Sequence, residues 1–246
     1  MTALRIFAIL FVRTKRVFFS PAIGGLFLLG LLGTGTSTTY GQTLSLVWSD
    51  EFNSVTRSNV DNTKWTYDTG NNFGWGNNEL EYYTRRTNNA YVAGGLLHIH
   101  AQIESTNTFN YTSARLKTQG LFNTLYGRIE WRAKLPAGTG MWPALWMMGS
   151  NSVSVPWPDC GEIDVVENDG AYPYFVQGSI HSGTDASNYY LLTPMARPPI
   201  SIFTIWIGRP TRSRGRSMAR LTKPKPVGEA PRRTLIRTPS TSRFTC

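Results

Sequence analysis

The sequence predicts an all-β protein, an antiparallel sandwich or jelly roll. Of its 246 residues, 13% are aromatic, 16% are charged and 23 are glycine, a composition typical of turn-rich β domains. From residue 44 onward, short stretches alternate polar and apolar side chains between turn residues, and no window carries a sustained helical period. The length suits one large β domain better than two small ones.

Four segments show the strand pattern most clearly. They read "LSLVW" at 44–48, "GGLLHIHAQI" at 94–103, "YTSARLKTQG" at 111–120 and "YGRIEWRAKLP" at 126–136. Alternation with a period of two places one set of side chains on the core face of a sheet and the other set toward solvent. The double glycine that opens the second segment predicts a tight turn before a strand.

The net charge of +10 resides at the two ends of the chain. Residues 1–43 hold four Lys and Arg and no acid, and residues 197–246 hold twelve and a single acid. The segment between them has nine basic and fourteen acidic residues. Because the central domain is acidic, we expect no nucleic-acid partner for it.

The N-terminal region 1–43 has the layout of a secretory signal. Arg13, Lys15 and Arg16 precede the apolar run "VFFSPAIGGLFLLGLLG", and a small, polar stretch follows. The alternative is a membrane anchor, but Pro21 and a glycine pair shorten the apolar run. We therefore expect a secreted protein, extracellular or periplasmic, that keeps no stable membrane association after cleavage.

Three acids lie within six positions of the apolar segment "CGEIDVVEN". Glu162 and Asp164 share one face of a strand, whereas strict alternation would turn Glu167 away from them. One extra residue in a β-bulge would return Glu167 to the same face. Clustered carboxylates raise one another's pKa, and glycosidic hydrolysis needs one ionised and one protonated carboxyl group. A solvated acidic face or a calcium site is the competing interpretation.

Aromatic residues flank these acids. Trp142 and Trp146 are an even number of positions apart in "GMWPALWMMG", and Trp157 directly precedes the acidic segment. Indole rings beside carboxylates are platforms on which the apolar face of a sugar can stack. We expect at least one of the three indoles to line a cleft rather than the core.

An ordered series of motifs resembles glycoside hydrolase family 16, especially the laminarinase-like β-1,3-glucanases. The series is "WGNNELEYYT", "YTSARLKT", "YGRIEWRAKLP", "GMWPALWMMG", "WPDCGEIDVVEN" and "VQGSIH". The resemblance covers roughly residues 44–190. It implies a concanavalin-like β-jelly-roll sandwich with an open cleft and retaining hydrolysis of internal β-1,3 or β-1,3-1,4 bonds in β-glucan. It further implies that no cofactor is required, and we expect a monomer.

The resemblance also implies roles for individual residues. It makes Glu162 the nucleophile, Glu167 the general acid/base and Asp164 the acid that exchanges hydrogen bonds with both. The implied substrate-binding residues are Trp142, Trp146, His181, Asn89 and Arg115. Glu51 and the carbonyl of Gly94 resemble part of a structural calcium site of some members, although its late acidic partner is not evident here.

The last fifty residues depart from the family pattern. Segment 197–246 is a basic tail rich in Pro, Ser and Thr with no strand pattern after Ile207, so C-terminal strands of the domain at 44–196 are expected to be missing. A shifted reading frame would explain the departure. In the frame that takes the last base of each codon with the first two bases of the next, Trp206–Ile207 must encode aspartate and Met218–Ala219 must encode glycine. Both residues continue the family pattern. We therefore interpret the tail as the product of a frameshift near 196–200 and expect the chain to be poorly active as translated.

Two other classes of protein compete with the enzyme. A non-catalytic, polysaccharide-binding jelly roll would share the fold and the aromatic residues, but intact Glu162 and Glu167 argue against it. A basic nucleic-acid-binding protein depends wholly on the tail, and its affinity for DNA would be lost on truncation at Ala196.

Overall fold

The computed structural model describes residues 11–14, 17–19, 45–183, 193–194, 200–208, 218–221, 225–226, 236–237 and 244–245. Within these residues all regular structure is strand except one turn of 3-10 helix, η1 (Asn72–Gly74). The predicted all-β class is therefore confirmed. No helix in the described part of the chain has the length and apolar character needed to cross a membrane.

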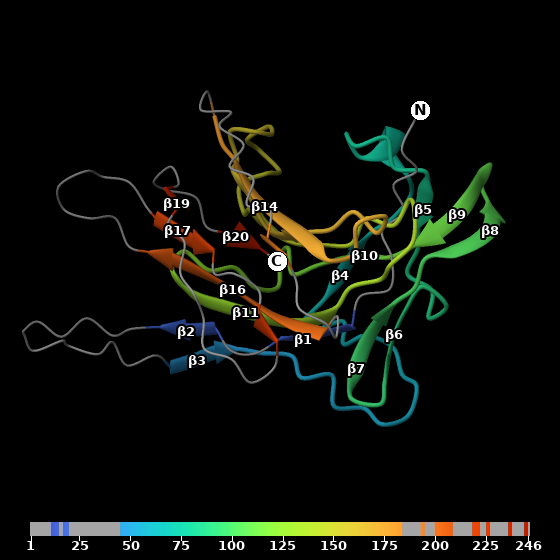
Figure 1. The fold of residues 1–246 in the computed structure, drawn as a ribbon, viewed down its shortest axis with the longest axis horizontal. Coiled ribbons are helices and arrows are strands. Elements are labelled where there is room, and N and C mark those ends of the chain that lie inside the picture. Colours follow the sequence, from blue (N-terminus) through green and yellow to red (C-terminus); the bar gives the residue numbers. More distant parts are fainter. Residues whose placement is uncertain are drawn as a thin grey trace, which may run out of the picture.

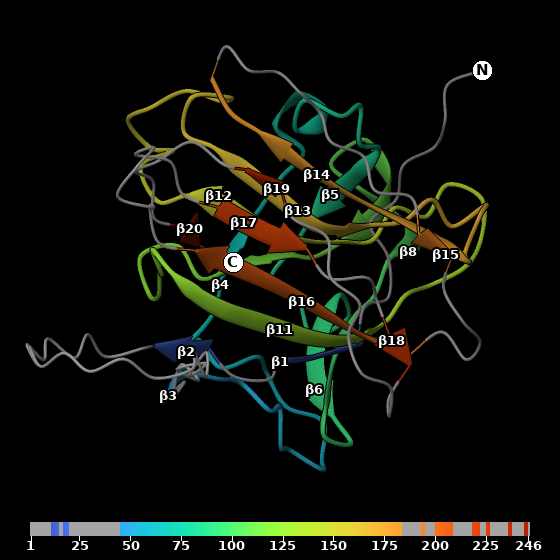
Figure 2. The ribbon, with the colours of Figure 1, turned by 60° about the vertical axis from the view of Figure 1, so that its left-hand side comes forward.

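Strands are grouped into four sheets (Figures 1 and 2). The ten-stranded sheet has the order β19-β17-β16-β11-β1-β7-β6, with β18 beside β16 and with β2 and β3 continuing from β11. Its strands are β1 (Phe11–Thr14), β2 (Val17–Phe19), β3 (Ser45–Trp48), β6 (Ala90–Ala93), β7 (Leu96–Ile99), β11 (Gly127–Lys134), β16 (Ile200–Gly208), β17 (Met218–Leu221), β18 (Lys225–Pro226) and β19 (Ile236–Arg237).

A five-stranded sheet of order β15-β14-β13-β12-β20 carries the acidic segment. It contains β12 (Ala144–Gly149), β13 (Glu162–Glu167), β14 (Phe175–His181), β15 (Thr193–Pro194) and β20 (Phe244–Thr245). Two small sheets complete the fold, one of order β10-β4 and one of order β5-β9-β8. Their strands are β4 (Thr66–Asp68), β5 (Glu81–Tyr83), β8 (Gln102–Thr106), β9 (Phe109–Ser113) and β10 (Arg115–Lys117).

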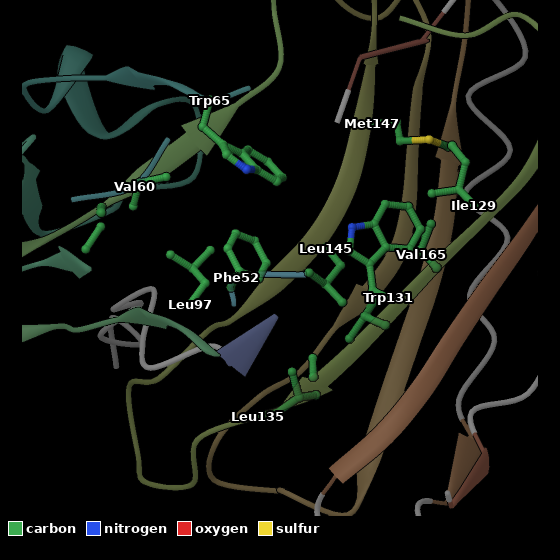
Figure 3. Packing of buried hydrophobic residues seen from close by; sticks show 14 of the residues in the cluster. Phe52, Val60, Trp65, Leu97, Ile129, Trp131, Leu135, Leu145, Met147 and Val165 are labelled. Atoms are coloured by element: carbon green, nitrogen blue, oxygen red, sulfur yellow. The ribbon is translucent and has the colours of Figure 1, made fainter. Parts of the chain in front are cut away.

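The two large sheets pack face to face and enclose the core. From β11 come Ile129 and Trp131, and from β12 come Leu145 and Met147, all at most 5% exposed. Figure 3 shows these side chains meeting in one layer, with Phe52 and Trp65 extending the same cluster. Side chains alternate along each strand, so β13 turns one set toward this layer and the other set away from it. The site lies on that second face.

Two features predicted from the sequence are confirmed in detail. The glycine pair turns β6 into β7, and Gly94 and Gly95 have φ values of +60° and +76°, which glycine adopts at no steric cost. The segment "YGRIEWRAKLP" contains β11, a strand of eight residues. Its even-spaced residues Ile129, Trp131 and Ala133 are all buried, as the alternation predicts.

The ends of the chain differ from expectation. Backbone segments of the predicted signal region pair as β1 with β11 and β7, and as β2 with β3. Beyond the predicted domain boundary, β16 pairs with β11 over eight positions, and β17, β18 and β19 follow it. The expectation that no strands follow Ile207 is therefore wrong for the described residues. Strand pairing needs only main-chain donors and acceptors, so an open sheet edge accepts a segment whose side chains lack a strand pattern. Removal of the signal region and the frameshift stay predictions.

Candidate functional site

A β-bulge in β13 brings its three acids to one face. Against β14, Asp164 faces Ser179 and Glu167 faces Gln177, so two residues of β13 oppose a single residue of its partner. Against β12 the register shifts between Leu145 and Trp146, at the same place in β13. The bulge predicted from the spacing of the acids is therefore confirmed. The apolar residues of the bulge, Val165 and Val166, are both in the core.

Glu162 occupies one end of the acidic row. Its Oε2 accepts a hydrogen bond from Nε1 of Trp157 at 2.6 Å, and its Cα partner on β14 is His181. Burial raises the pKa of Glu162 to about 7, and the neighbouring carboxylate of Asp164 raises it further against the opposing effect of the Trp157 N–H. At neutral pH this carboxyl group is therefore poised between its two protonation states.

Asp164 is the buried centre of the row and is 4% exposed. The hydroxyl of Ser179 donates a short hydrogen bond to its Oδ2, and Nε2 of His181 lies 3.1 Å from the same oxygen. The hydrogen bond with Asp164 raises the pKa of His181 above its ordinary value. Asp164 thus lies between Ser179 and His181, and its carboxylate acts on both glutamates.

Glu167 occupies the other end of the row. Its Oε1 accepts from Nε1 of Trp142 at 3.0 Å, and its Oε2 accepts from Nε2 of Gln177 at 3.2 Å. Burial raises the pKa of Glu167, and the charge of Asp164 acts in the same direction. Each glutamate is therefore oriented by its own indole N–H, while Asp164 lies between them.

Three residues of this constellation were not among the predicted site residues. Gln177 and Ser179 come from β14, and Trp157 precedes β13. A signal for two of them was present in the sequence, because Gln177, Ser179 and His181 alternate along "VQGSIH" and so share the face that carries the histidine. Trp157, 57% exposed, was recognised as a neighbouring aromatic residue but given no hydrogen-bonding role.

Trp146 and Arg115 form an adjoining part of the site. Trp146 is the Cα partner of Asp164 on β12. The guanidinium carbon of Arg115 lies 4.7 Å from the centre of the Trp146 ring and 4.6 Å from that of Trp75. Arg115 is thus held between two indoles, where its side chain is 17% exposed. With most of its side chain covered, Arg115 leaves little surface for contact with a sugar.

The structure does not place Asn89 at the site, and its prediction as a sugar contact is wrong. The residue is fully buried. Its Nδ2 donates to the carbonyl of His100 at 3.0 Å and to Oγ1 of Thr112 at 2.9 Å, while its Oδ1 accepts from Thr84 and Arg86. The amide therefore links strands in the interior, a role that a polar residue in an alternating segment does not reveal by its spacing.

A cavity of about 340 Å³ adjoins the site without including the acids. Arg115, Trp146 and Trp157 line it together with the core residues Trp65 and Trp131. The cavity therefore reaches from Trp146 and Trp157, the indoles beside the acids, toward the core between the two large sheets.

The described residues contain no group of three or more His, Cys, Asp and Glu side chains that could hold a metal ion. Glu51 follows β3, and Gly94 lies in the β6–β7 turn, where its amide donates to the carbonyl of Val55 at 3.2 Å. A calcium ion at Glu51 and Gly94 would draw on carbonyl oxygens as well, so this site stays a prediction.

Fold and site together define a class of protein. Paired carboxyl groups on one strand, oriented by aromatic N–H groups on one sheet of a β-sandwich, are the equipment of a glycosidase. Comparisons with known proteins agree. Residues 33–174 match the family model described as beta-glucan synthesis-associated protein SKN1/KRE6/Sbg1.

The individual relatives are described as glucanases or laminarinases. A beta-glucanase of Rhodothermus marinus is 46% identical over 171 residues, which cover 65% of this chain and 58% of that protein. The crystal structure of the laminarinase from Rhodothermus marinus matches with a TM-score of 0.66 and 34% identity, covering 81% of this chain and 82% of that one. A non-specific endo-β-1,3(4)-glucanase from family GH16 matches with a TM-score of 0.65 and 29% identity, over 94% of this chain and 83% of that one. The chain belongs to glycoside hydrolase family 16 and is laminarinase-like.

Proposed function

We propose that this protein hydrolyses internal β-1,3 or β-1,3-1,4 glucosidic bonds of a β-glucan with retention of configuration. One observation carries the proposal: Glu162 and Glu167 lie on one face of β13 on either side of Asp164, each held by a separate indole N–H. A protein that only bound polysaccharide would need the aromatic residues but not this pair of oriented carboxyl groups.

In the proposed reaction the carboxylate of Glu162 attacks the anomeric carbon while the carboxyl group of Glu167 protonates the departing glycosidic oxygen. The resulting glycosyl ester is then hydrolysed by a water molecule that Glu167, now ionised, deprotonates. Asp164 favours a proton on its neighbours, and the Trp157 N–H favours the ionised form of Glu162. The pair can therefore share one proton near neutral pH, and the titration belongs to the cluster as a whole.

The printed descriptions of the relatives support a β-glucan as the substrate, and Trp142 and Trp146 are the proposed platforms for its rings. The reaction as proposed uses no cofactor. We also infer secretion, on the strength of the basic and apolar segments of region 1–43.

The test is hydrolysis of laminarin by the purified chain, with its mass confirmed to end at Cys246. Reducing ends should appear, the first product should have the β-anomeric configuration by NMR, and Glu162→Gln should abolish cleavage while laminari-oligosaccharides still bind. A chain with its frame restored after Ala196 serves as the comparison, and we expect it to be the more active of the two. If neither chain cleaves laminarin or mixed-linkage glucan, the proposed function is wrong.

A further inference from the structure

A second group of charges, partly to fully buried, adjoins Trp146. Arg115, on β10, pairs through Nε with Asp68 Oδ2 at 3.2 Å and through Nη1 with Glu79 Oε1 at 3.5 Å. Lys117, which is also on β10, forms a short ion pair with Asp68 on β4. Since the guanidinium of Arg115 also lies between the rings of Trp75 and Trp146, any change in the charge around Arg115 acts on Trp146 directly.

Glu79 is the most enclosed acid in contact with Arg115, and its side chain has no exposed surface. The hydroxyl of Tyr83 lies 2.7 Å from Glu79 Oε2 and 2.9 Å from Glu81 Oε1. A phenol has only one hydrogen, so it can donate to one carboxylate, and the other contact needs a proton on the carboxyl group itself. The geometry therefore indicates that Glu79 and Glu81 together hold an extra proton.

The balance of charges around Glu79 also indicates one extra proton. Two cations, Arg115 and Lys117, meet three carboxyl groups: those of Asp68, Glu79 and Glu81. Burial raises the pKa of Glu79 to about 7, Glu81 raises it as well, and Arg115, Tyr83 and Asn77 oppose the rise. Glu79 thus changes its charge close to neutral pH.

We propose that Glu79 is a positioning residue that acts through Arg115 to hold the indole of Trp146 in place for β-glucan binding. When Glu79 is ionised, its attraction to the guanidinium strengthens the contact of Arg115 with the Trp146 ring. Trp146 is the Cα partner of Asp164, so the placement of its ring sets the platform next to the acids. The identity of the ligand rests on the proposed function. The coupling of Glu79 to Trp146 through Arg115 does not.

The alternative is a network that stabilises the fold and has no influence on the site. A double-mutant cycle at pH 8 distinguishes the two. It uses the full chain with Glu162→Gln, so that laminaritetraose binds without being cleaved, and measures its Kd by calorimetry. Glu79→Gln should weaken binding about 5-fold, and the same change in a Trp146→Phe background should have no further effect. Equal losses in both backgrounds would overturn the proposal.

Two comparisons complete the design. At pH 5.5, where Glu79 is protonated, Glu79→Gln should leave the Kd unchanged within 2-fold, roughly the limit for independent sites. The matched control Glu104→Gln removes a carboxylate from the exposed ion pair with Arg86 and should have no effect at either pH. A loss in Glu79→Gln that is the same at both pH values would also overturn the proposal.

A measurement without sugar separates this proposal from the proposed function. Tryptophan fluorescence of the Glu162→Gln chain is titrated from pH 5 to pH 9, with and without Glu79→Gln and Trp146→Phe. We expect a component near pH 7 that each of these two substitutions removes. If the chain binds no oligosaccharide but the component is present, the ligand is wrong and the coupling holds. If Trp146→Phe leaves the component unchanged, the coupling is refuted.

Discussion

The buried carboxyl group of Glu79 makes the stability of the protein depend on pH in a way that one substitution can remove. The pKa of Glu79 is raised from 4.5 to about 7, so the folded state binds its proton more tightly than the unfolded state does. Stability from this group is therefore fully present below pH 4.5 and is lost as the pH rises through about 7. Each pH unit in that window contributes roughly 1.4 kcal/mol, which gives about 3 kcal/mol in all.

Glu79→Gln should remove this loss, because glutamine has the shape of the protonated acid and does not titrate. Its amide N–H can face Tyr83 while its carbonyl faces Arg115. Between pH 5 and pH 8 the unsubstituted chain should therefore lose about 2.5 kcal/mol of its free energy of unfolding that the variant keeps. At pH 8 we therefore expect Glu79→Gln to be more stable than the unsubstituted chain and to bind glucan more weakly. This is the pattern of a residue whose role in binding costs stability.

The assay is urea unfolding followed by circular dichroism at pH 5, 6, 7 and 8, with the slope of free energy against urea checked for constancy. Glu104→Gln is the control, because the Thr112 hydrogen bond lowers the pKa of Glu104 and its pH dependence has the opposite sign. If Glu79→Gln and the unsubstituted chain lose stability equally between pH 5 and pH 8, Glu79 does not carry the buried proton and the reasoning fails.

Three further predictions concern the active site and the C-terminus. Deletion of Val165 should remove the bulge, turn Glu167 away from Glu162 and lower kcat at least ~10³-fold, with laminarin hydrolysis as the readout; activity within 10-fold of the parent would contradict the assigned role of the bulge. The kcat/KM for laminarin should fall as the pH drops below about 7, because Glu162 then takes up a proton; a profile that stays flat from pH 5 to pH 7 would refute its assignment as the nucleophile. Resequencing the coding DNA across residues 195–207 should reveal a missing or extra base, and a confirmed reading would leave the tail at 197–246 as genuine.

The acidic row shows how much of the site was accessible from sequence. The spacing of Glu162, Asp164 and Glu167 required a bulge if all three were to share a face, and the register against β12 and β14 has that bulge. The strand period alone was enough for this step, because a one-residue offset has only one common structural remedy. The hydrogen bonds from Trp142 and Trp157 could not be obtained in the same way, since both indoles come from outside regular strands.

Asn89 and Arg115 mark the point at which sequence reasoning was insufficient. Both were expected to contact sugar, and both are polar residues next to strand patterns. Burial separates them: Asn89 spends its whole amide on interior partners, whereas Arg115 reaches the back of Trp146 with Asp68 and Glu79 behind it. No local period encodes this difference, because the partners come from distant segments: Thr112 of β9 for Asn89 and Asp68 of β4 for Arg115. A charged residue in an alternating segment therefore predicts a polar environment, and only the packed structure shows whether that environment is the substrate or the support beneath it.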